Sequence, residues 1–74
     1  MDIEVSLFAT LRQGRFRQKR LQLPCGGTVA DVCRQLAIDQ HEVAILLVNE
    51  AAVQRDHPLS PGDAVSLFPA IGGG

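Results

Sequence analysis

The residues of this sequence best placed to do chemistry are at its C-terminal end, which reads Ile71-Gly72-Gly73-Gly74. Because glycines carry no side chain, a narrow channel in a partner protein could close directly around their backbone. The reactive group of this end is then the carboxylate of Gly74. A carboxylate must first be activated, for example as an acyl-adenylate that another protein makes from ATP, and the adenylate can then accept sulfur to become a thiocarboxylate. The pattern predicts that this chain presents the group and that a partner performs the catalysis.

The residues before the glycines predict where the folded part of the chain ends. Pro69 lacks a backbone N–H, so we expect it to end the hydrogen-bond ladder of the last strand. We therefore predict a domain over residues 1–68 and an extended glycine-rich tail over residues 69–74. A six-residue extended tail reaches about 20 Å, and Ile71 is its sizeable apolar side chain. The alternative is an inert glycine-rich end without a function.

The elements that must position this end begin with two strands. Residues 3–8 alternate apolar and polar side chains, which is typical of a half-buried strand. Residues 17–23 predict a second strand, with Lys19 at the frayed edge of its apolar face. Gly14 permits a turn between the two, so we expect a hairpin.

A helix is predicted to begin at Thr28, whose hydroxyl can accept a hydrogen bond from the first turn while Asp31 reaches back to its N-terminus. Its apolar side chains recur at helical spacing and form one stripe. The stripe consists of Val29, Val32, Cys33, Leu36 and Ala37. We expect the helix to end near residues 38–39.

Further strands are predicted after the helix. Residues 43–48 are rich in branched aliphatic side chains and favour a well-buried strand. We expect a turn at 49–50, a short edge strand at 52–54, a loop or single helical turn at 56–60, and a type II turn at 60–63 before a last strand at 64–68. This order predicts the α+β class and a β-grasp fold, with one main crossover helix on a small mixed sheet.

Two of the three phenylalanines are predicted to lie on the face of the sheet away from the helix. If Val5 and Leu7 face the helix, Phe8 points the other way, and the same phase in the last strand turns Phe68 outward. The first and last strands are neighbours in a β-grasp sheet, so the two rings could form an apolar docking patch. The alternative is that the strand ends twist and both rings fold over the sheet edge.

Basic residues are concentrated near the N-terminus although the net charge is −1. Five of the seven lie in the first twenty positions: Arg12, Arg15, Arg17, Lys19 and Arg20. A basic cluster can contact nucleic acid, but no aromatic residues are arranged for base stacking, so we expect no nucleic-acid partner. We interpret the stretch as a solvated turn whose charge could steer an acidic partner.

The cysteines and histidines predict neither a metal site nor a bound cofactor. Cys25, Cys33, His41 and His57 do not match a zinc pattern, and an iron–sulfur cluster would need four thiolates. We interpret Cys33 as a core residue, Cys25 as a loop thiol and the histidines as surface residues.

No apolar run approaches the roughly 20 residues of a membrane span. The N-terminus is acidic where a signal peptide would be basic, so we expect a cytoplasmic, reduced protein.

Four segments resemble a known family. They are Leu7-Phe8-Ala9-Thr10-Leu11-Arg12, Gly27-Thr28-Val29-Ala30-Asp31-Val32, Leu59-Ser60-Pro61-Gly62-Asp63-Ala64-Val65 and the end Phe68-Pro69-Ala70-Ile71-Gly72-Gly73-Gly74. On these segments the sequence resembles the MoaD/ThiS family of ubiquitin-like sulfur carriers over nearly its full length. The first and last are closer to MoaD, the small subunit of molybdopterin synthase. The third glycine, Gly72, departs from the family pattern.

The resemblance implies that the chain is a carrier rather than an enzyme. It implies that Gly74 is adenylated by an E1-like adenylyltransferase (MoeB/ThiF-like), which uses ATP, and is then converted to a thiocarboxylate. The sulfur would build molybdopterin, for the molybdenum cofactor, inside a larger MoaE-like catalytic subunit of molybdopterin synthase.

The resemblance, taken together with the strand phases and the glycine end, predicts roles for residues of the chain. Ile71, Gly72 and Gly73 would enter the channel of the partner. Phe8, Phe68 and Pro69 would form the partner interface.

Three other functions remain open at this level. The chain could be a ThiS-like or other sulfur carrier that serves thiamine, tRNA thiolation or amino-acid synthesis. It could be a ubiquitin-like modifier whose Gly74 forms isopeptide bonds with lysines. It could also be a β-grasp interaction module whose tail is inert.

Overall fold

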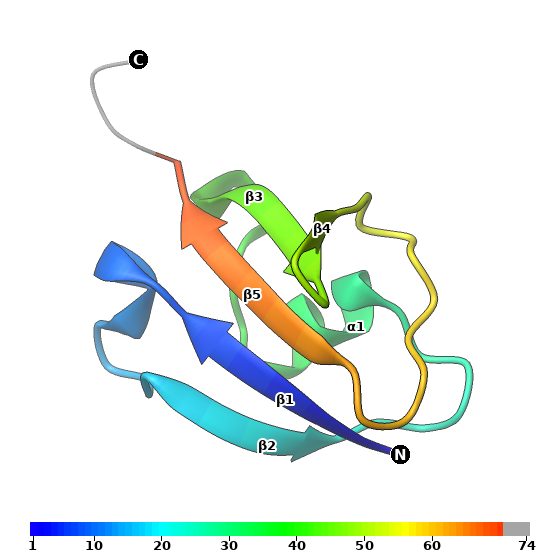
Figure 1. The fold of residues 1–74 in the computed structure, drawn as a ribbon. Helices are drawn as coiled ribbons and strands as arrows, with labels where there is room; N and C mark the ends of the chain where they lie inside the picture. Colours follow the sequence, from blue (N-terminus) through cyan, green and yellow to red (C-terminus); the bar gives the residue numbers. More distant parts are fainter. Residues whose placement is uncertain (71–74) are drawn as a thin grey trace.

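Residues 1–70, which the computed structural model describes, form a five-stranded sheet with one α-helix across one face (Figure 1). The elements are β1 (Asp2–Leu7), 3-10 helix η1 (Ala9–Arg12), β2 (Gln18–Gln22), α1 (Val29–Gln35), 3-10 helix η2 (Gln40–Glu42), β3 (Val43–Val48), β4 (Ala51–Ala52) and β5 (Ala64–Pro69). The strand order is β2-β1-β5-β3-β4, and only β1 and β5 are parallel among these described strands. This confirms the predicted mixed sheet of the α+β class.

The centre of the sheet is the parallel pair β1 and β5. Val5 lies opposite Val65, and Leu7 lies opposite Leu67. All four side chains are at most 1% exposed, because this register turns the same face of both strands towards α1.

The predicted hairpin is confirmed, since β1 and β2 pair antiparallel. β2 is one residue shorter at each end than the predicted strand. Lys19 lies opposite the buried Val5 and is itself exposed, with its ammonium 5.8 Å from the centre of the Phe16 ring. A long side chain at an edge strand can keep its charge in water in this way.

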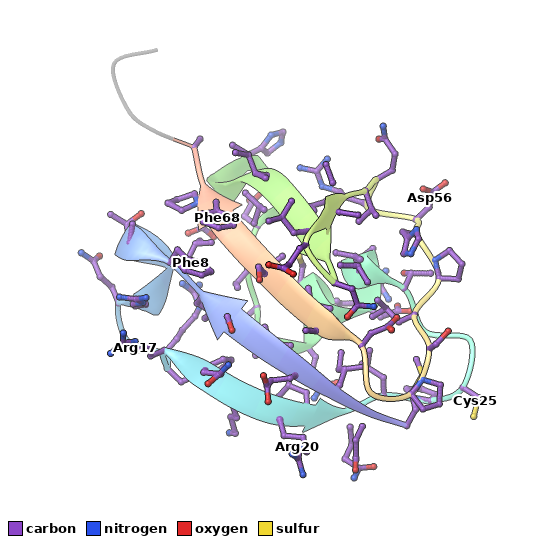
Figure 2. The ribbon with its side chains drawn as sticks, viewed as in Figure 1. Phe8, Arg17, Arg20, Cys25, Asp56 and Phe68 are labelled. Atoms are coloured by element: carbon purple, nitrogen blue, oxygen red, sulfur yellow. The ribbon has the colours of Figure 1, made fainter. Side chains whose placement is uncertain are left out.

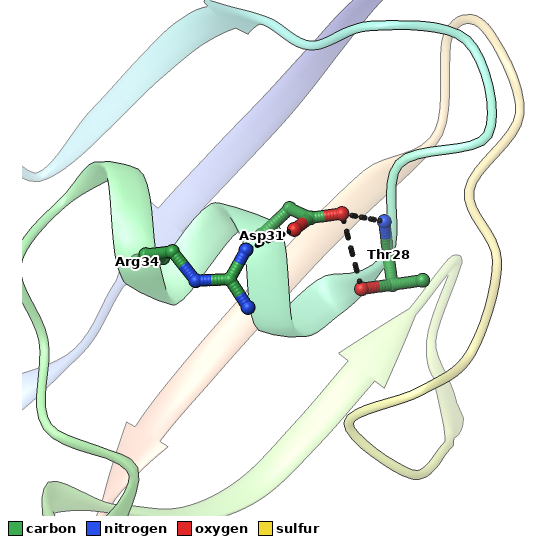
Figure 3. A network of polar contacts seen from close by, with 3 residues as sticks. All are labelled: Thr28, Asp31 and Arg34. Carbon is green, nitrogen blue, oxygen red and sulfur yellow. Dashed lines mark hydrogen bonds and ion pairs between the residues drawn. The ribbon is translucent and has the colours of Figure 1, made fainter.

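Helix α1 begins as predicted, with a capping box formed by Thr28 and Asp31 (Figure 3). The backbone N–H of Thr28 donates to Asp31 Oδ2 at 2.8 Å, and Arg34 Nη1 donates to Asp31 Oδ1 at 2.6 Å. The Thr28 bond is the largest cause that lowers the pKa of Asp31. Three members of the predicted stripe are buried against the sheet: Val29, Val32 and Cys33.

The helix ends at Gln35, earlier than predicted, and the assignment of Ala37 to the apolar stripe is wrong. Ala37 is exposed and adopts a left-handed φ of 55°. Its N–H bonds the carbonyl of Arg34 at 3.2 Å, while the N–H of Ile38 bonds the carbonyl of Cys33 at 2.9 Å. These two bonds form a Schellman motif that reverses the chain, so Ile38 enters the core in place of Ala37.

The predicted turns are confirmed. Asn49 and Glu50 connect β3 to β4 with φ values of 50° and 71°, the sign that a type I′ turn requires at both positions. Gly62 has a φ of 85°, and the N–H of Asp63 bonds the carbonyl of Ser60 at 3.1 Å, as expected for the type II turn. The short edge strand lies at Ala51–Ala52, slightly before its predicted place, and residues 56–60 form a loop.

The last strand extends to Pro69, one residue beyond the predicted end of the domain. Pro69 lies opposite Val43, and the N–H of Ala70 then donates to the carbonyl of Glu42 at 3.1 Å. β1 ends at Leu7, opposite Leu67, so beyond Leu67 the strand β5 pairs only with β3. A proline, which lacks a backbone N–H, is tolerated at such a one-sided position.

Sixteen buried apolar side chains of residues 1–70 form one core between α1 and the sheet. Leu11 of η1 and Leu59 of the loop before β5 also belong to this core. Cys33 belongs to this core as predicted, and burial raises the pKa of its thiol. No helix within residues 1–70 is long and apolar enough to cross a membrane.

The Schellman motif predicts a stabilising substitution at Ala37. A left-handed residue with a Cβ costs about 1–2 kcal/mol, and glycine avoids this cost. We expect Ala37→Gly to raise the free energy of unfolding, measured by urea denaturation, by about 1 kcal/mol. The matched control is Ala30→Gly inside α1, which should lower it by about 1 kcal/mol. A loss of stability in Ala37→Gly would contradict the motif.

The capping box predicts a pH dependence. Because the pKa of Asp31 is lowered from 3.8 in the folded state, its ionised form contributes stability above that value, and the contribution is lost as the pH falls through the folded pKa. We expect Asp31→Asn to flatten the decline of stability in acid, measured by urea denaturation from neutral to acidic pH. Asp56→Asn, in the exposed loop, removes the same charge and should leave the decline unchanged. Equal profiles for the two variants would contradict this role for Asp31.

Candidate functional site

Phe8 and Phe68 meet on the outer face of the sheet, the face opposite α1, as the strand phases predicted (Figure 2). Their ring centres are 4.2 Å apart and their planes differ by 9°, so the rings are stacked. The N–H of Phe8 donates to the carbonyl of Leu67 at 3.2 Å, which continues the parallel register of β1 and β5 past the last paired residues. Both rings are half-buried.

Ile45 and Leu47 extend this apolar surface, and the sequence analysis missed both. Ile45 lies opposite Phe68 and is 50% exposed, and the half-buried Leu47 lies opposite Ser66. The run at residues 43–48 was predicted to be well buried, which is wrong for Ile45. One helix covers only one face of the sheet, so about half of the side chains of each strand must face outward. This constraint could have predicted outward-facing residues in the run at 43–48.

A register irregularity between Val43 and Ile45 decides which residues of β3 face outward. It leaves Val43, Leu46 and Val48 buried. We call Phe8, Ile45, Leu47 and Phe68 the outer-face patch. A group of outward-facing aromatic and branched apolar side chains, partly accessible to solvent, is the composition of a protein-binding surface.

The patch lies beside the place where the chain leaves the sheet. Pro69, predicted to lie at the partner interface, follows Phe68 and is half-buried. Ala70 is held by its bond to Glu42. The predicted chemistry at Gly74 and the predicted channel residues Ile71, Gly72 and Gly73 lie outside the described residues.

Positive charge borders the patch. Arg12 Nε donates to the carbonyl of Leu7 at 2.7 Å, and its guanidinium lies 5.5 Å from the centre of the Phe8 ring. This is the distance of a cation–π contact, so Arg12 is oriented by both β1 and the aromatic pair. Arg15 is turned away from the patch and reaches the carbonyls of Leu11 and Ala37.

The remaining candidate residues lie apart from the patch. Cys25 is an exposed loop thiol, as predicted, and His41 is exposed while His57 is half-buried. No group of three or more histidine, cysteine or acidic side chains within residues 1–70 could hold a metal ion. Asp63, in the turn before β5, has its pKa lowered chiefly by the N–H of Ser60.

Comparison of the sequence with family models shows a match to the ThiS family over residues 5–74. The chain belongs to the ThiS family. This agrees with the resemblance to MoaD/ThiS proteins, a family of small sulfur carriers and ubiquitin-like modifiers. Comparison with curated proteins finds no matching sequence.

Solved structures confirm the ubiquitin-like β-grasp fold. SAMP1 of Haloferax volcanii is 26% identical, with 100% of each chain covered and a TM-score of 0.80. The HVO 2177 protein of Haloferax volcanii is 31% identical, with 100% of this chain and 87% of that chain covered and a TM-score of 0.78. A Pyrococcus furiosus protein assigned as molybdopterin converting factor, subunit 1, is 25% identical, with 96% and 99% covered and a TM-score of 0.78.

The outward orientation of Ile45 can be tested against its buried neighbour. Leu46 is 7% exposed, so Leu46→Ala should lower the free energy of unfolding by about 2–5 kcal/mol in urea denaturation. Ile45→Ala should cost at most about 1 kcal/mol, because half of this side chain is already in water. Equal losses in the two variants would place Ile45 in the core and contradict the patch.

Proposed function

We propose that this protein is a sulfur carrier that donates sulfur for molybdopterin and hence molybdenum cofactor biosynthesis. The observation that carries the proposal is the ThiS family match, which runs through the glycine end to Gly74. The likeness to the Pyrococcus furiosus protein assigned as molybdopterin converting factor, subunit 1, supports the molybdopterin branch over other carriers.

The proposed chemistry takes place at the carboxylate of Gly74. Its oxygen attacks the α-phosphorus of ATP, which forms the acyl-adenylate and releases pyrophosphate. A hydrosulfide ion supplied by the activation system then attacks the acyl carbon, AMP leaves, and loss of the proton gives the thiocarboxylate. Both steps belong to an E1-like adenylyltransferase of the MoeB/ThiF kind, so this chain needs no cofactor of its own.

The fold contributes recognition and placement to this chemistry. The outer-face patch supplies apolar area for docking, including the stacked rings of Phe8 and Phe68. Aromatic side chains are enriched at protein interfaces. We propose that Phe8, Phe68 and Pro69 contact a MoaE-like large subunit, which uses the sulfur. Anchorage of Ala70 to Glu42 sets the point at which the chain departs towards that subunit.

The last four residues complete the proposal. Ile71, Gly72 and Gly73 would pass through a narrow channel of either partner, because glycine backbone needs the least width. The carrier and its partners would act in the cytoplasm.

A second candidate function is protein modification. It is favoured by the likeness to SAMP1, a small archaeal modifier protein, at 26% identity. In this case a lysine amine of a target would attack the acyl-adenylate of Gly74 and form an isopeptide bond with loss of AMP. The two functions share activation and differ in the nucleophile.

Intact mass spectrometry of the protein, expressed with its activating enzyme, tests the proposal. We expect a species heavier by one O-to-S exchange at the C-terminus. Deletion of Gly74 should abolish this species and leave the urea denaturation curve unchanged, since residues 1–70 contain the core. An unshifted mass with an enzyme that forms the adenylate would refute the sulfur carrier, and lysine-linked conjugates would assign the modifier function instead.

A further inference from the structure

A second recognition element lies next to the outer-face patch. Ser6, Phe8, Arg12, Arg17 and Gln18 line a pocket of about 240 Å³. Phe8 belongs to both features, so the pocket is continuous with the patch. Arg17 lies directly before β2, where its carbonyl accepts from the N–H of Leu7, the residue before Phe8 (Figure 2). The pocket therefore combines an aromatic wall with two guanidinium groups.

The two arginines keep their charge available to a ligand. Arg12 uses Nε to bind the carbonyl of Leu7, which holds the guanidinium in place while its two terminal nitrogens stay outside that bond. Arg17 is exposed. Neither Arg12 nor Arg17 forms an ion pair with an acidic side chain of residues 1–70.

The polar side chains of the pocket are arranged around Gln18. Its amide nitrogen donates to Glu4 Oε1 at 3.0 Å and to Ser6 Oγ at 3.3 Å. Because Ser6 Oγ accepts this bond, its own hydroxyl proton remains available as a donor. The Glu4 carboxylate therefore lies beside these polar atoms, and Gln18 binds it. The donors that remain are all suited to an anion.

We propose that this pocket receives an aspartate or glutamate carboxylate of a protein partner whose apolar side chain docks on the outer-face patch. The inference rests on the proposed function, because it describes how the partner of that function is oriented. A carboxylate fits the fork of a guanidinium through two parallel hydrogen bonds, which adds direction to an apolar contact that has none of its own.

The observations favour a carboxylate on a protein over a polyanion. The pocket is bordered by Phe8 and continues into the apolar side chains of the outer-face patch. A protein partner can bury apolar surface against these side chains, whereas a phosphate chain cannot. Glu4 on the same face and the net charge of −1 both oppose a nucleic-acid backbone. A single carboxylate beside an apolar side chain brings only one negative charge near Glu4, whereas a nucleic-acid backbone brings several.

Two capped dipeptides supply the test, Ac-Phe-Glu-NH2 and its neutral analogue Ac-Phe-Gln-NH2. Each is titrated into the full chain labelled with ¹⁵N, and binding is followed through the backbone amide signals of Ser6, Phe8, Arg17 and Gln18. We expect the acidic peptide to bind about threefold to fivefold more tightly, the range for one partly exposed charge pair. The preference should shrink at about 1 M salt, where screening extends over only about 3 Å.

Two matched variants test whether the preference for the acidic peptide depends on an arginine of this pocket. Arg17→Gln should remove the preference for the acidic peptide while the neutral peptide binds as before. Arg20→Gln removes the same charge from the same strand, but Arg20 lines a different hollow with Asp2 and Gly62, so the preference should persist. Equal affinity of the two peptides, or equal loss of preference in both variants, would overturn the proposal.

Two further titrations examine the other anions. Inorganic phosphate and a single-stranded DNA dodecamer should each shift these four signals less than the acidic peptide does at the same concentration. Stronger binding of either one would overturn the proposal in favour of a phosphate site. None of these titrations uses an activating enzyme, so failure here would leave the thiocarboxylate result standing, and an unshifted mass in the first experiment would leave the peptide preference standing.

Discussion

The parallel pairing of β1 with β5 is the constraint on which the rest of the structure depends. It brings the two ends of the domain together at the centre of the sheet and buries Val5, Leu7, Val65 and Leu67 almost completely. Parallel strands in register must turn the same phase inward and the same phase outward. The stack of Phe8 on Phe68 is the outward counterpart of the buried pair Leu7 and Leu67. The same register therefore determines both the buried face that forms the core and the outward face that carries the candidate site.

A single helix can cover only one face of this sheet, and this determines where recognition can occur. The covered face holds the core, whereas the outer face presents whatever the alternation of each strand leaves there. Near the end of β5 these side chains are apolar, and towards β2 they become polar and basic. Because β5 also leads directly to Pro69 and Ala70, docking contacts and the departing chain share one end of the molecule. A carrier that must present its terminus to a partner is served by this arrangement.

Local sequence signals predicted much of the fold because their causes are local. The capping box at Thr28 and Asp31 and the positive φ of Gly62 each involve residues within one turn. The strand phases were also local enough to place Phe8 and Phe68 on one face. The end of the helix was predicted too late, because the Schellman motif at Ala37 has an alanine where the usual signal is glycine. Ile45 was missed because a continuous aliphatic run does not reveal a register irregularity in β3.

The sequence by itself determined the elements, the β-grasp order and the glycine end that suggests the chemistry, since composition, periodicity and turn residues specify these locally. Tertiary structure alone decided which side chains surround the place where that end departs. Sheet register brought Ile45 against Phe68, and it placed Arg12 and Arg17 at one pocket beside Phe8. Pairing between distant strands sets these neighbours, and no local pattern encodes the register of such pairing. The end of β5 thus acquires its neighbours from residues that lie far from it in the chain.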